Sequence, residues 1–392
     1  MKKAGRDPIS QRVQAIPASG IRKYFDLMNS MEDVISLGVG EPDFVTPWHI
    51  SEAGIYAVEK GFTMYTSNYG LIELRQEIAK NIMERHGIEY DPETEILVTS
   101  GSSEALDLAM RATLDPGCEV IIADPSYVAY MPYAVLSGGR VVPVPTEMGN
   151  EFKMRPGDIE ERITVDSRVL LLGYPNNPTG TVLDRAELEG IAETAANHDL
   201  MVISDDIYDR LVYDGPNTCL AALPGMRERT ILVNGFSKAY AMTGWRIGYA
   251  AAPAEIIEAM MKVHQYVMMC APIMGQMAAI EALRNGEEAV RRMVADYDRR
   301  RHVIVDGLNQ IGLDCFMPKG AFYAFPSVGA TGLTSDEFVE KLLKEEGVVV
   351  VPGSVFGECG EGYVRCCYAV ALPDIEEALE RMGRFVQRYR GS

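Results

Sequence analysis

Short apolar runs that alternate with helical patterns constrain the fold of this chain more than any other feature. From Glu95 onward seven such runs recur, at residues 96–99, 120–123, 140–144, 169–173, 201–204, 231–234 and 247–251. Helical patterns precede and separate them, notably at residues 48–60, 71–85, 103–114 and 185–197. Continuous apolar strands with helices between them are typical of a mostly parallel sheet that is covered on both faces. The pattern predicts an α/β fold, with residues 46–275 as one large domain.

The character of the chain changes after Pro272. Thr334 and Glu337 form a capping-box signal at the start of a helical pattern. The helices and strands predicted in this part of the chain cover residues 276–310, 320–326, 335–346, 348–351, 363–368 and 373–389. We therefore predict a smaller α+β domain, formed by residues 276–392 and completed by an N-terminal arm of residues 1–45.

The size and charge of the chain narrow its possible functions. With 392 residues, of which 47% are hydrophobic, the chain can bury a sizeable core, and its length suggests about two domains. The formal net charge of -19 argues against nucleic acids and anionic membranes as partners. No apolar run approaches the ~20 residues that span a bilayer, and the first residues lack the apolar core of a signal peptide. We therefore expect a cytoplasmic protein with neither nucleic-acid nor membrane partners.

Cysteines and histidines give little support to a disulfide framework or a metal site. The seven cysteines are an odd number without CxxC spacing, which indicates reduced thiols. Cys366 and Cys367 are adjacent within an apolar strand pattern, and we interpret them as small buried hydrophobic residues. The five histidines contain no pair at i,i+4 spacing, so we expect no metal.

Polar residues follow the ends of several predicted strands, and ligands bind at these ends in open α/β sheets. After the first strand, the amides of Ser102 and Ser103 lie at a predicted helix N-terminus. Such a position is an anion site by geometry and dipole, although serine caps are also common without a ligand. Asn177 follows the fourth strand, where it offers a donor to an oxygen or simply belongs to a turn. Tyr127 follows the second strand.

An acid and a phenol follow the fifth strand. Asp205 and Tyr208 are three residues apart, a spacing that places both side chains on one face of an incipient helix. An ionised Asp205 could hold a pyridine nitrogen protonated while the Tyr208 phenol donates to a ring oxygen. The alternative is that Asp205 only caps a helix.

Lys238 lies between the sixth and seventh strands, where a charge is expensive to bury. Burial favours the neutral form of a lysine, and a neutral amine can form a Schiff base with an aldehyde. Arg246, eight residues later, stays charged and suits a phosphate. Pyridoxal phosphate is an aldehyde that carries a phosphate, and this pair of residues matches it.

Two segments ahead of the sheet contain further candidates. Gly38 and Gly40 allow the backbone to approach a ligand closely, or form a turn with the neighbouring proline. Tyr65 lies in a polar loop that is either ordinary surface or reaches a partner subunit.

Eight stretches occur in an order and at a spacing that identify a family. They are Ser-Leu-Gly-Val-Gly-Glu-Pro-Asp-Phe (36–44), Tyr-Thr-Ser-Asn-Tyr-Gly (65–70), Val-Thr-Ser-Gly-Ser-Ser-Glu-Ala-Leu (98–106), Asn-Asn-Pro-Thr-Gly (176–180), Ser-Asp-Asp-Ile-Tyr (204–208), Ser-Lys followed by Gly-Trp-Arg-Ile-Gly (237–248), Lys-Gly-Ala-Phe-Tyr (319–323) and Tyr-Val-Arg (363–365). Over essentially its whole length the chain resembles the class I and II aminotransferases of pyridoxal-phosphate fold type I. It looks most similar to the archaeal-type aromatic and aspartate aminotransferases.

The resemblance implies roles for the matching positions. Lys238, Asp205 and Tyr208 would be the catalytic residues, with Lys238 bound covalently to the cofactor. The implied cofactor contacts are Gly101, Ser102, Ser103, Tyr127, Asn177, Asp205, Tyr208, Ser237, Lys238, Arg246 and, from the second subunit of a homodimer, Tyr65. The implied substrate contacts are Gly40, Tyr127, Asn177 and Arg365, whose guanidinium suits an α-carboxylate. Many relatives have a serine where this chain has Gly235, which puts the phosphate contact of Ser237 in doubt.

The resemblance also implies a reaction, the transfer of an amino group between an L-amino acid and a 2-oxo acid such as 2-oxoglutarate. Aromatic amino acids or aspartate would be favoured, and Tyr24 or Phe25 could stack on an aromatic substrate or fill the core. Because one fold supports several chemistries, two alternatives stay open. One is a C–S β-lyase that acts on cystathionine-like substrates. The other is a non-catalytic regulatory protein that binds pyridoxal phosphate.

Overall fold

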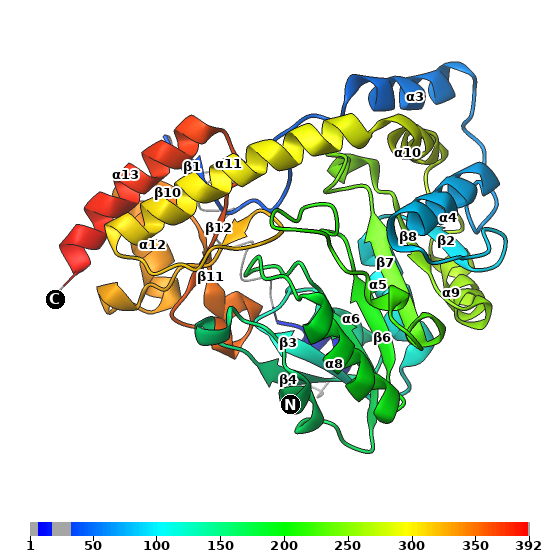
Figure 1. Ribbon diagram of the computed structural model, residues 1–392, viewed down its shortest axis with the longest axis horizontal. Helices are drawn as coiled ribbons and strands as arrows, with labels where there is room; N and C mark the ends of the chain where they lie inside the picture. Colours follow the sequence, from blue (N-terminus) through cyan, green and yellow to red (C-terminus); the bar gives the residue numbers. More distant parts are fainter. Residues whose placement is uncertain (1–6, 18–32, 391–392) are drawn as a thin grey trace, which may run out of the picture.

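A seven-stranded sheet forms the centre of the computed structural model, which describes residues 7–17 and 33–390 (Figure 1). Tyr24 and Phe25 lie outside the described residues. The strand order is β2-β8-β7-β6-β5-β3-β4, and only β8 runs antiparallel to its neighbours. The strands are β2 (Ile96–Thr99), β3 (Glu119–Asp124), β4 (Arg140–Pro145), β5 (Ser167–Leu172), β6 (Met201–Asp205), β7 (Thr230–Gly235) and β8 (Gly248–Ala251). The predicted mostly parallel α/β sheet is confirmed.

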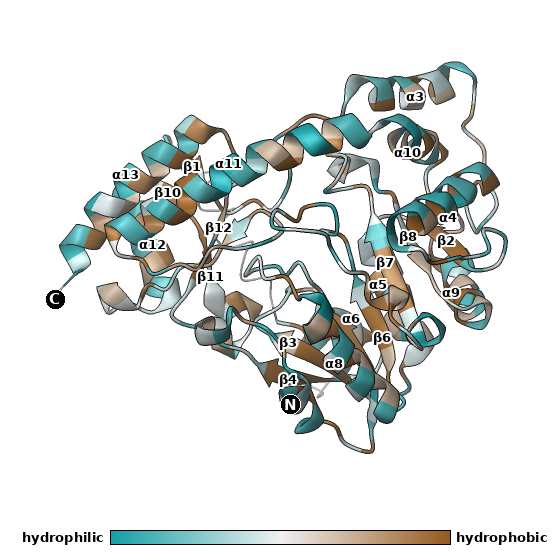
Figure 2. Ribbon diagram, viewed as in Figure 1, coloured by the Kyte–Doolittle hydropathy of each residue, from teal (hydrophilic) through white to brown (hydrophobic). Residues whose placement is uncertain are grey.

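Helices cover both faces of this sheet because successive strand residues point to opposite sides. In β5, Val169 and Leu171 pack with α5 (Ser102–Thr113), α6 (Tyr130–Leu136) and α9 (Ala254–Val267). Leu170 and Leu172 pack instead with α8 (Arg185–Asn197). The remaining helices of this part are α1 (Gln11–Gln14), α3 (Trp48–Glu59), α4 (Ile72–His86) and α7 (Pro156–Glu160). Figure 2 shows the sheet strands in hydrophobic colours, as expected for strands buried on both faces.

The end of the chain builds a second group of elements against an early segment. Its strands are β9 (Tyr323–Ala324), β10 (Val348–Val349), β11 (Val351–Pro352) and β12 (Val364–Cys367), and its helices are α12 (Ser335–Glu346) and α13 (Leu372–Tyr389). β1 (Ile35–Ser36) pairs in parallel with β10, so residues before the large sheet contact residues far after it. α12 begins with the predicted capping box of Thr334 and Glu337. The division into two domains stays a prediction.

Two predicted elements in this part are divided in the structure. The helix expected over residues 276–310 is two helices, α10 (Ile273–Asn285) and α11 (Glu287–Ile311). They meet at Gly286, where a Cβ would collide with the Ala282 carbonyl and the Tyr240 ring. The strand expected over residues 348–351 is divided between β10 and β11, which pair with different partners. Every residue of that run is buried, so its apolar pattern did not indicate the division.

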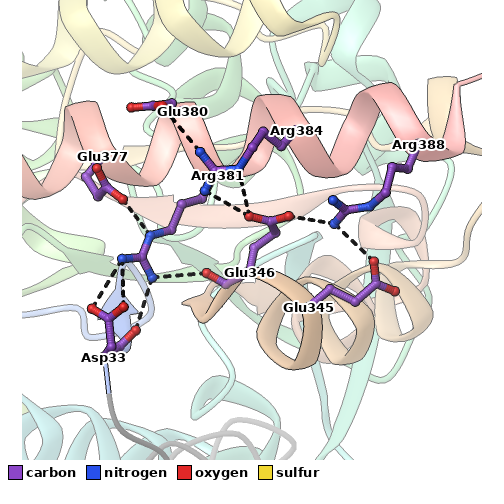
Figure 3. Close-up of polar contacts among 8 residues, drawn as sticks. All are labelled: Asp33, Glu345, Glu346, Glu377, Glu380, Arg381, Arg384 and Arg388. Carbon is purple, nitrogen blue, oxygen red and sulfur yellow. Dashed lines mark hydrogen bonds and ion pairs between the residues drawn. The ribbon is translucent and has the colours of Figure 1, made fainter.

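α13 holds the segment before β1 through Arg381 (Figure 3). The Arg381 guanidinium donates to the backbone carbonyl of Asp33 at 3.0 Å and to that of Glu346 at 3.2 Å. It also forms ion pairs with the carboxylates of Asp33 and Glu377. One side chain thus joins α13, the last turn of α12 and the chain entering β1.

The cysteines are reduced in the structure, as the sequence indicated. All seven cysteines are free, and Cys366 and Cys367 are buried in β12 as interpreted from the sequence. Among the helices of residues 7–17 and 33–390, none has the length and apolar character needed to cross a membrane.

Candidate active site

A cavity of about 440 Å³ opens between the carboxyl ends of the central strands and the second group of elements. Most of the predicted site residues line it, and they come from eight different segments of the chain. They are Gly40, Ser102, Ser103, Tyr127, Asn177, Asp205, Tyr208, Ser237, Lys238, Arg246 and Arg365. Gly101 does not line the cavity but lies against Arg246, which does, whereas Tyr65 is 77% exposed and lies outside the cavity.

Lys238 follows β7 and turns its amine into the cavity. Its Nζ donates a hydrogen bond to the carbonyl oxygen of Gly40 at 2.5 Å. The rings of Tyr208 and Phe322 lie 5.7 and 5.6 Å from the same atom, measured to their centroids. Burial lowers the pKa of Lys238 to about 8, and the charge of Arg365 acts in the same direction. The amine is therefore available in its neutral, nucleophilic form near neutral pH.

Asp205 ends β6 and is buried beside the cavity. Its Oδ2 accepts a hydrogen bond from the Tyr130 hydroxyl at 2.8 Å, and its Oδ1 accepts one from the Ile207 amide at 3.3 Å. Burial raises the pKa of Asp205 to about 6, and these two hydrogen bonds oppose the rise. The carboxylate is thus a buried anion whose one side-chain donor is a phenol.

Tyr130 was not predicted from the sequence, although a signal for it exists. The predicted fourth strand ends in a glycine, and a Cβ at Gly173 would collide with the Tyr130 hydroxyl. The glycine therefore leaves the space through which the phenol reaches Asp205. A tyrosine at the start of a helix, three residues after Tyr127, was the other indication.

Tyr208 lines the cavity, but the incipient helix expected to carry it is wrong. The Asp206 amide bonds to Val233 on β7, and the following residues form only turns. Val212 then forms a bridge with Gly320, which draws the chain away toward the second group of elements. The Tyr208 hydroxyl instead lies 2.6 Å from the hydroxyl of Tyr323, a second site residue that the sequence interpretation left without a role.

The part of the cavity at the start of α5 is suited to bind an anion. α5 begins after Gly101, which caps the helix without a side chain, so the amides of Ser102 and Ser103 keep their positive ends free of a side-chain cap. A Cβ at Gly101 would collide with the Arg246 guanidinium, which therefore lies against this turn. Arg246 is exposed and donates to the Thr243 carbonyl at 2.9 Å. Backbone dipole and arginine charge act here in the same place.

Arg365 lies on β12 and also lines the cavity. Its two terminal nitrogens donate to Asn177 Oδ1 at 2.9 Å and to the Gly38 carbonyl at 2.7 Å. The Tyr323 and Phe356 rings lie 4.5 and 5.1 Å from the guanidinium carbon. Its Nε is buried without a hydrogen-bond partner among the described residues. A buried guanidinium that lines a cavity is suited to bind a carboxylate.

Gly40 has no room for a side chain. A Cβ there would lie 2.5 Å from the Tyr323 hydroxyl. The backbone of this segment therefore forms the cavity wall directly, and its carbonyls face Lys238 and Arg365.

Comparisons with known proteins place the chain among aminotransferases. The family model described as aminotransferase class I and II matches residues 32–382. The aromatic-amino-acid aminotransferase 2 of Thermococcus litoralis is 46% identical, and the aspartate aminotransferase of Pyrococcus abyssi is 47% identical. Each alignment covers 97% of this chain and 98% of the relative. The crystal structure of an aromatic aminotransferase from Pyrococcus horikoshii OT3 has a TM-score of 0.89 at 47% identity, over 94% of this chain and 99% of that one.

The cofactor of that family is pyridoxal phosphate, and the residues of the cavity fit it. The cavity presents an amine with a lowered pKa, a buried carboxylate for a ring nitrogen, and an arginine beside free helix amides for a phosphate. The missing side chain at Gly101 leaves Arg246 its place in this cradle. Together with the match over nearly the full length, this means that the chain belongs to the class I and II aminotransferases, enzymes that transfer amino groups with pyridoxal phosphate.

Proposed function

We propose that this aminotransferase moves an amino group between an L-amino acid, with aromatic residues or aspartate favoured, and a 2-oxo acid such as 2-oxoglutarate. One observation carries the proposal: Lys238 and the buried guanidinium of Arg365 line the same cavity. An amine that reacts with carbonyls and a cation that binds carboxylates are the two handles that an α-amino acid requires. The names of the aromatic and aspartate relatives support the substrate classes.

We assign the cofactor to the chain's own residues as follows. Lys238 would hold it covalently, and Asp205 would accept a hydrogen bond from its ring nitrogen. Tyr208 and Asn177 would contact the ring oxygen, and Tyr127 would cover the ring face. The phosphate would be held by Gly101, Ser102 and Ser103 at the start of α5 together with Ser237 and Arg246. When bound, the cofactor supplies an aldehyde and an electron-poor ring that draws negative charge away from the substrate's Cα.

The side chains then have separate tasks in the reaction. Arg365, with Asn177 and the backbone at Gly40, binds the α-carboxylate and orients the Cα–H bond. Lys238 takes the proton from Cα, a task for which a pKa near 8 is suited because it lies close to neutral pH. Asp205 in its ionised form would keep the ring electron-poor, and Tyr130 holds Asp205 in place.

We also assign a homodimer, in which Tyr65 reaches the phosphate of the partner's site. Large hydrophobic side chains are exposed close to this residue in sequence at Met64, on α3 at Trp48, Tyr56 and Val58, and at the end of α9 at Tyr266 and Val267. Gln276 connects these segments, since it donates to Thr66 and to Ala271. An apolar surface of this kind is typical of a subunit interface. A cytoplasmic location completes the assignment.

A half-reaction screen tests the function. The purified protein carrying pyridoxal phosphate is mixed with each of the 20 common amino acids, and the cofactor absorbance is followed without any oxo acid. We expect aromatic amino acids or aspartate to change the spectrum fastest, and 2-oxoglutarate to reverse the change. Release of pyruvate and ammonia from cystathionine without an oxo acid would instead favour a C–S β-lyase. A retained cofactor with no reaction over the whole panel would favour a regulatory protein.

A further inference from the structure

Glu104 and His264 form a buried pair behind the turn that begins α5. Glu104 Oε1 lies 2.7 Å from His264 Nδ1, and His264 is completely buried on α9. Glu104 Oε2 accepts a hydrogen bond from the Ser100 amide at 2.5 Å. The carboxylate thus connects α9 to the turn of residues 100–101. Neither side chain lines the cavity, and the proposed reaction does not use them.

The position of Glu104 in the helix explains why this arrangement is unusual. In a capping box, the side chain of the N-cap residue binds the amide of the third helical residue, whose acid binds back to the N-cap amide. Here the N-cap is Gly101, which has no side chain, and Glu104 is the third residue of α5. Its carboxylate reaches past Gly101 to Ser100. Glu104 thus holds the start of α5 through Ser100. The amides of Ser102 and Ser103, two residues that line the cavity, have no side-chain cap.

His264 completes the arrangement from the neighbouring helix. Its Nε2 has no hydrogen-bond partner among the described residues. A proton on Nδ1 therefore suits the ring, because Nε2 is then a lone pair instead of a buried donor without an acceptor. In this tautomer the imidazole donates to Glu104, which already accepts from Ser100. A displacement of either side chain would shift the turn and would change the space that Gly101 leaves for Arg246.

We propose that Glu104 and His264 are positioning residues for the cofactor phosphate. They hold residues 100–101 so that the amides of Ser102 and Ser103 face the same point as the Arg246 guanidinium. The inference rests on the proposed function, since it takes the phosphate to bind at this end of the cavity. It adds two residues that do not line the cavity to those on which phosphate binding depends.

Binding of pyridoxal phosphate and of pyridoxal, which lacks the phosphate, tests the proposal. The full-length chain is freed of cofactor and titrated with each compound, and the ratio of the two dissociation constants is measured. We expect Glu104→Ala to weaken pyridoxal phosphate binding by about tenfold or more, with little change for pyridoxal. Glu104→Gln keeps an acceptor for the Ser100 amide, so it should recover most of the lost affinity. His264→Leu is the second test, because it removes the donor and keeps the site apolar.

A matched control comes from Glu119, another buried glutamate. It lies at the far end of β3 and accepts from Thr164 at 2.6 Å and from Ser167 at 3.0 Å. Glu119→Ala should lower stability without changing the ratio. Equal losses for both compounds, or none, in Glu104→Ala and His264→Leu would overturn the positioning role. Arg246→Ala separates the two proposals: if it leaves the ratio unchanged, the phosphate does not bind here and the cofactor assignment within the proposed function is wrong.

Discussion

The Lys238 amine donates a hydrogen bond to the carbonyl oxygen of Gly40, a residue 198 positions earlier in the chain. Its other close neighbours are the rings of Tyr208 and Phe322, which offer little solvation to a full charge. One carbonyl in aromatic surroundings orients an amine without keeping it protonated. The contact thus joins two requirements of a reactive lysine, a fixed position and a lowered pKa.

Covalent incorporation of pyridoxal phosphate into the cofactor-free protein should depend on the protonation of Lys238. Only the neutral amine attacks an aldehyde, so the rate should rise with pH and level off above about 8, the lowered pKa of Lys238. Borohydride trapping at timed intervals, followed by mass spectrometry of the Lys238 peptide, measures the rate. A rate that continues to rise toward the ordinary lysine value of 10.5 would contradict the lowered pKa.

The same pKa makes a prediction about stability. Between about pH 8 and 10.5, the unfolded chain holds a proton on Lys238 that the folded, cofactor-free chain lacks. Below pH 8 the buried lysine therefore lowers the free energy of unfolding by its full amount. This loss of stability becomes smaller as pH rises through the interval. Urea unfolding of the protein and of Lys238→Met at several pH values measures it. The difference in free energy of unfolding should move in favour of the unaltered protein as pH rises, and a constant difference would contradict the assignment.

Arg365→Lys should weaken substrate binding more than it slows the reaction. A lysine presents a single ammonium nitrogen in place of the planar fork whose two terminal nitrogens donate to Asn177 and Gly38. We expect KM for the amino acid to rise about 10- to 100-fold, with a smaller change in kcat. Steady-state kinetics with a saturating oxo acid measure both values. Arg292→Lys, at an exposed position on α11, is the control. A fall in kcat at constant KM would assign Arg365 a different role.

Tyr130→Phe should change how cofactor binding depends on pH. The Tyr130 hydroxyl lowers the pKa of Asp205, although burial keeps the net value raised to about 6. The cofactor-free protein therefore takes up a proton at Asp205 as pH falls through about 6, and affinity for the cofactor should fall with it. In Tyr130→Phe this loss should begin at a higher pH. Fluorescence titrations from pH 5 to 8 measure it, with the buried, hydrogen-bonded Tyr174→Phe as the control. Identical profiles would exclude a role for the phenol.

Arg381→Met should lower the free energy of unfolding by about 1–3 kcal/mol, because it leaves the Glu346 carbonyl and the Asp33 segment without their charged donor (Figure 3). Two of its acceptors are backbone carbonyls, so much of the loss should persist at high salt. Arg384→Met, on the same helix but 48% exposed, should cost at most about 1 kcal/mol. Urea denaturation compares the two variants. Equal losses in the free energy of unfolding would contradict a larger contribution of the Arg381 contacts.

The sequence predicted those parts of the fold that depend on uninterrupted burial. Strands such as β6, enclosed on both faces, read as apolar runs, and α8 was located correctly by its periodicity. The break at Gly286 could not be predicted, because it depends on the Tyr240 ring, a contact distant in sequence. The antiparallel direction of β8 was equally hidden, since an apolar run has no direction.

Some residues of the candidate site could be predicted from the sequence, and others could not. Lys238 was predicted from its place between two buried strands and Arg365 from the family resemblance, and the cavity contains both. Tyr130 and Tyr323 act through contacts with Asp205 and Tyr208 that lie 75 and 115 residues away. A tyrosine that acts only by contacting another site residue leaves no recognisable pattern in the sequence. The roles of all these residues remain predictions for the experiments above.

The contacts of Arg365 also have a consequence for the newly made chain. Its guanidinium binds the Gly38 carbonyl across 327 residues and Asn177 across 188. A ribosome adds residues in order, so Gly38, Asn177 and Lys238 are all synthesised long before their arginine. Closing such a long loop also carries an entropic cost that grows with its length. In the role proposed for Arg365, a nascent chain therefore has no means to hold an amino acid until residue 365 has been synthesised and has reached these two partners.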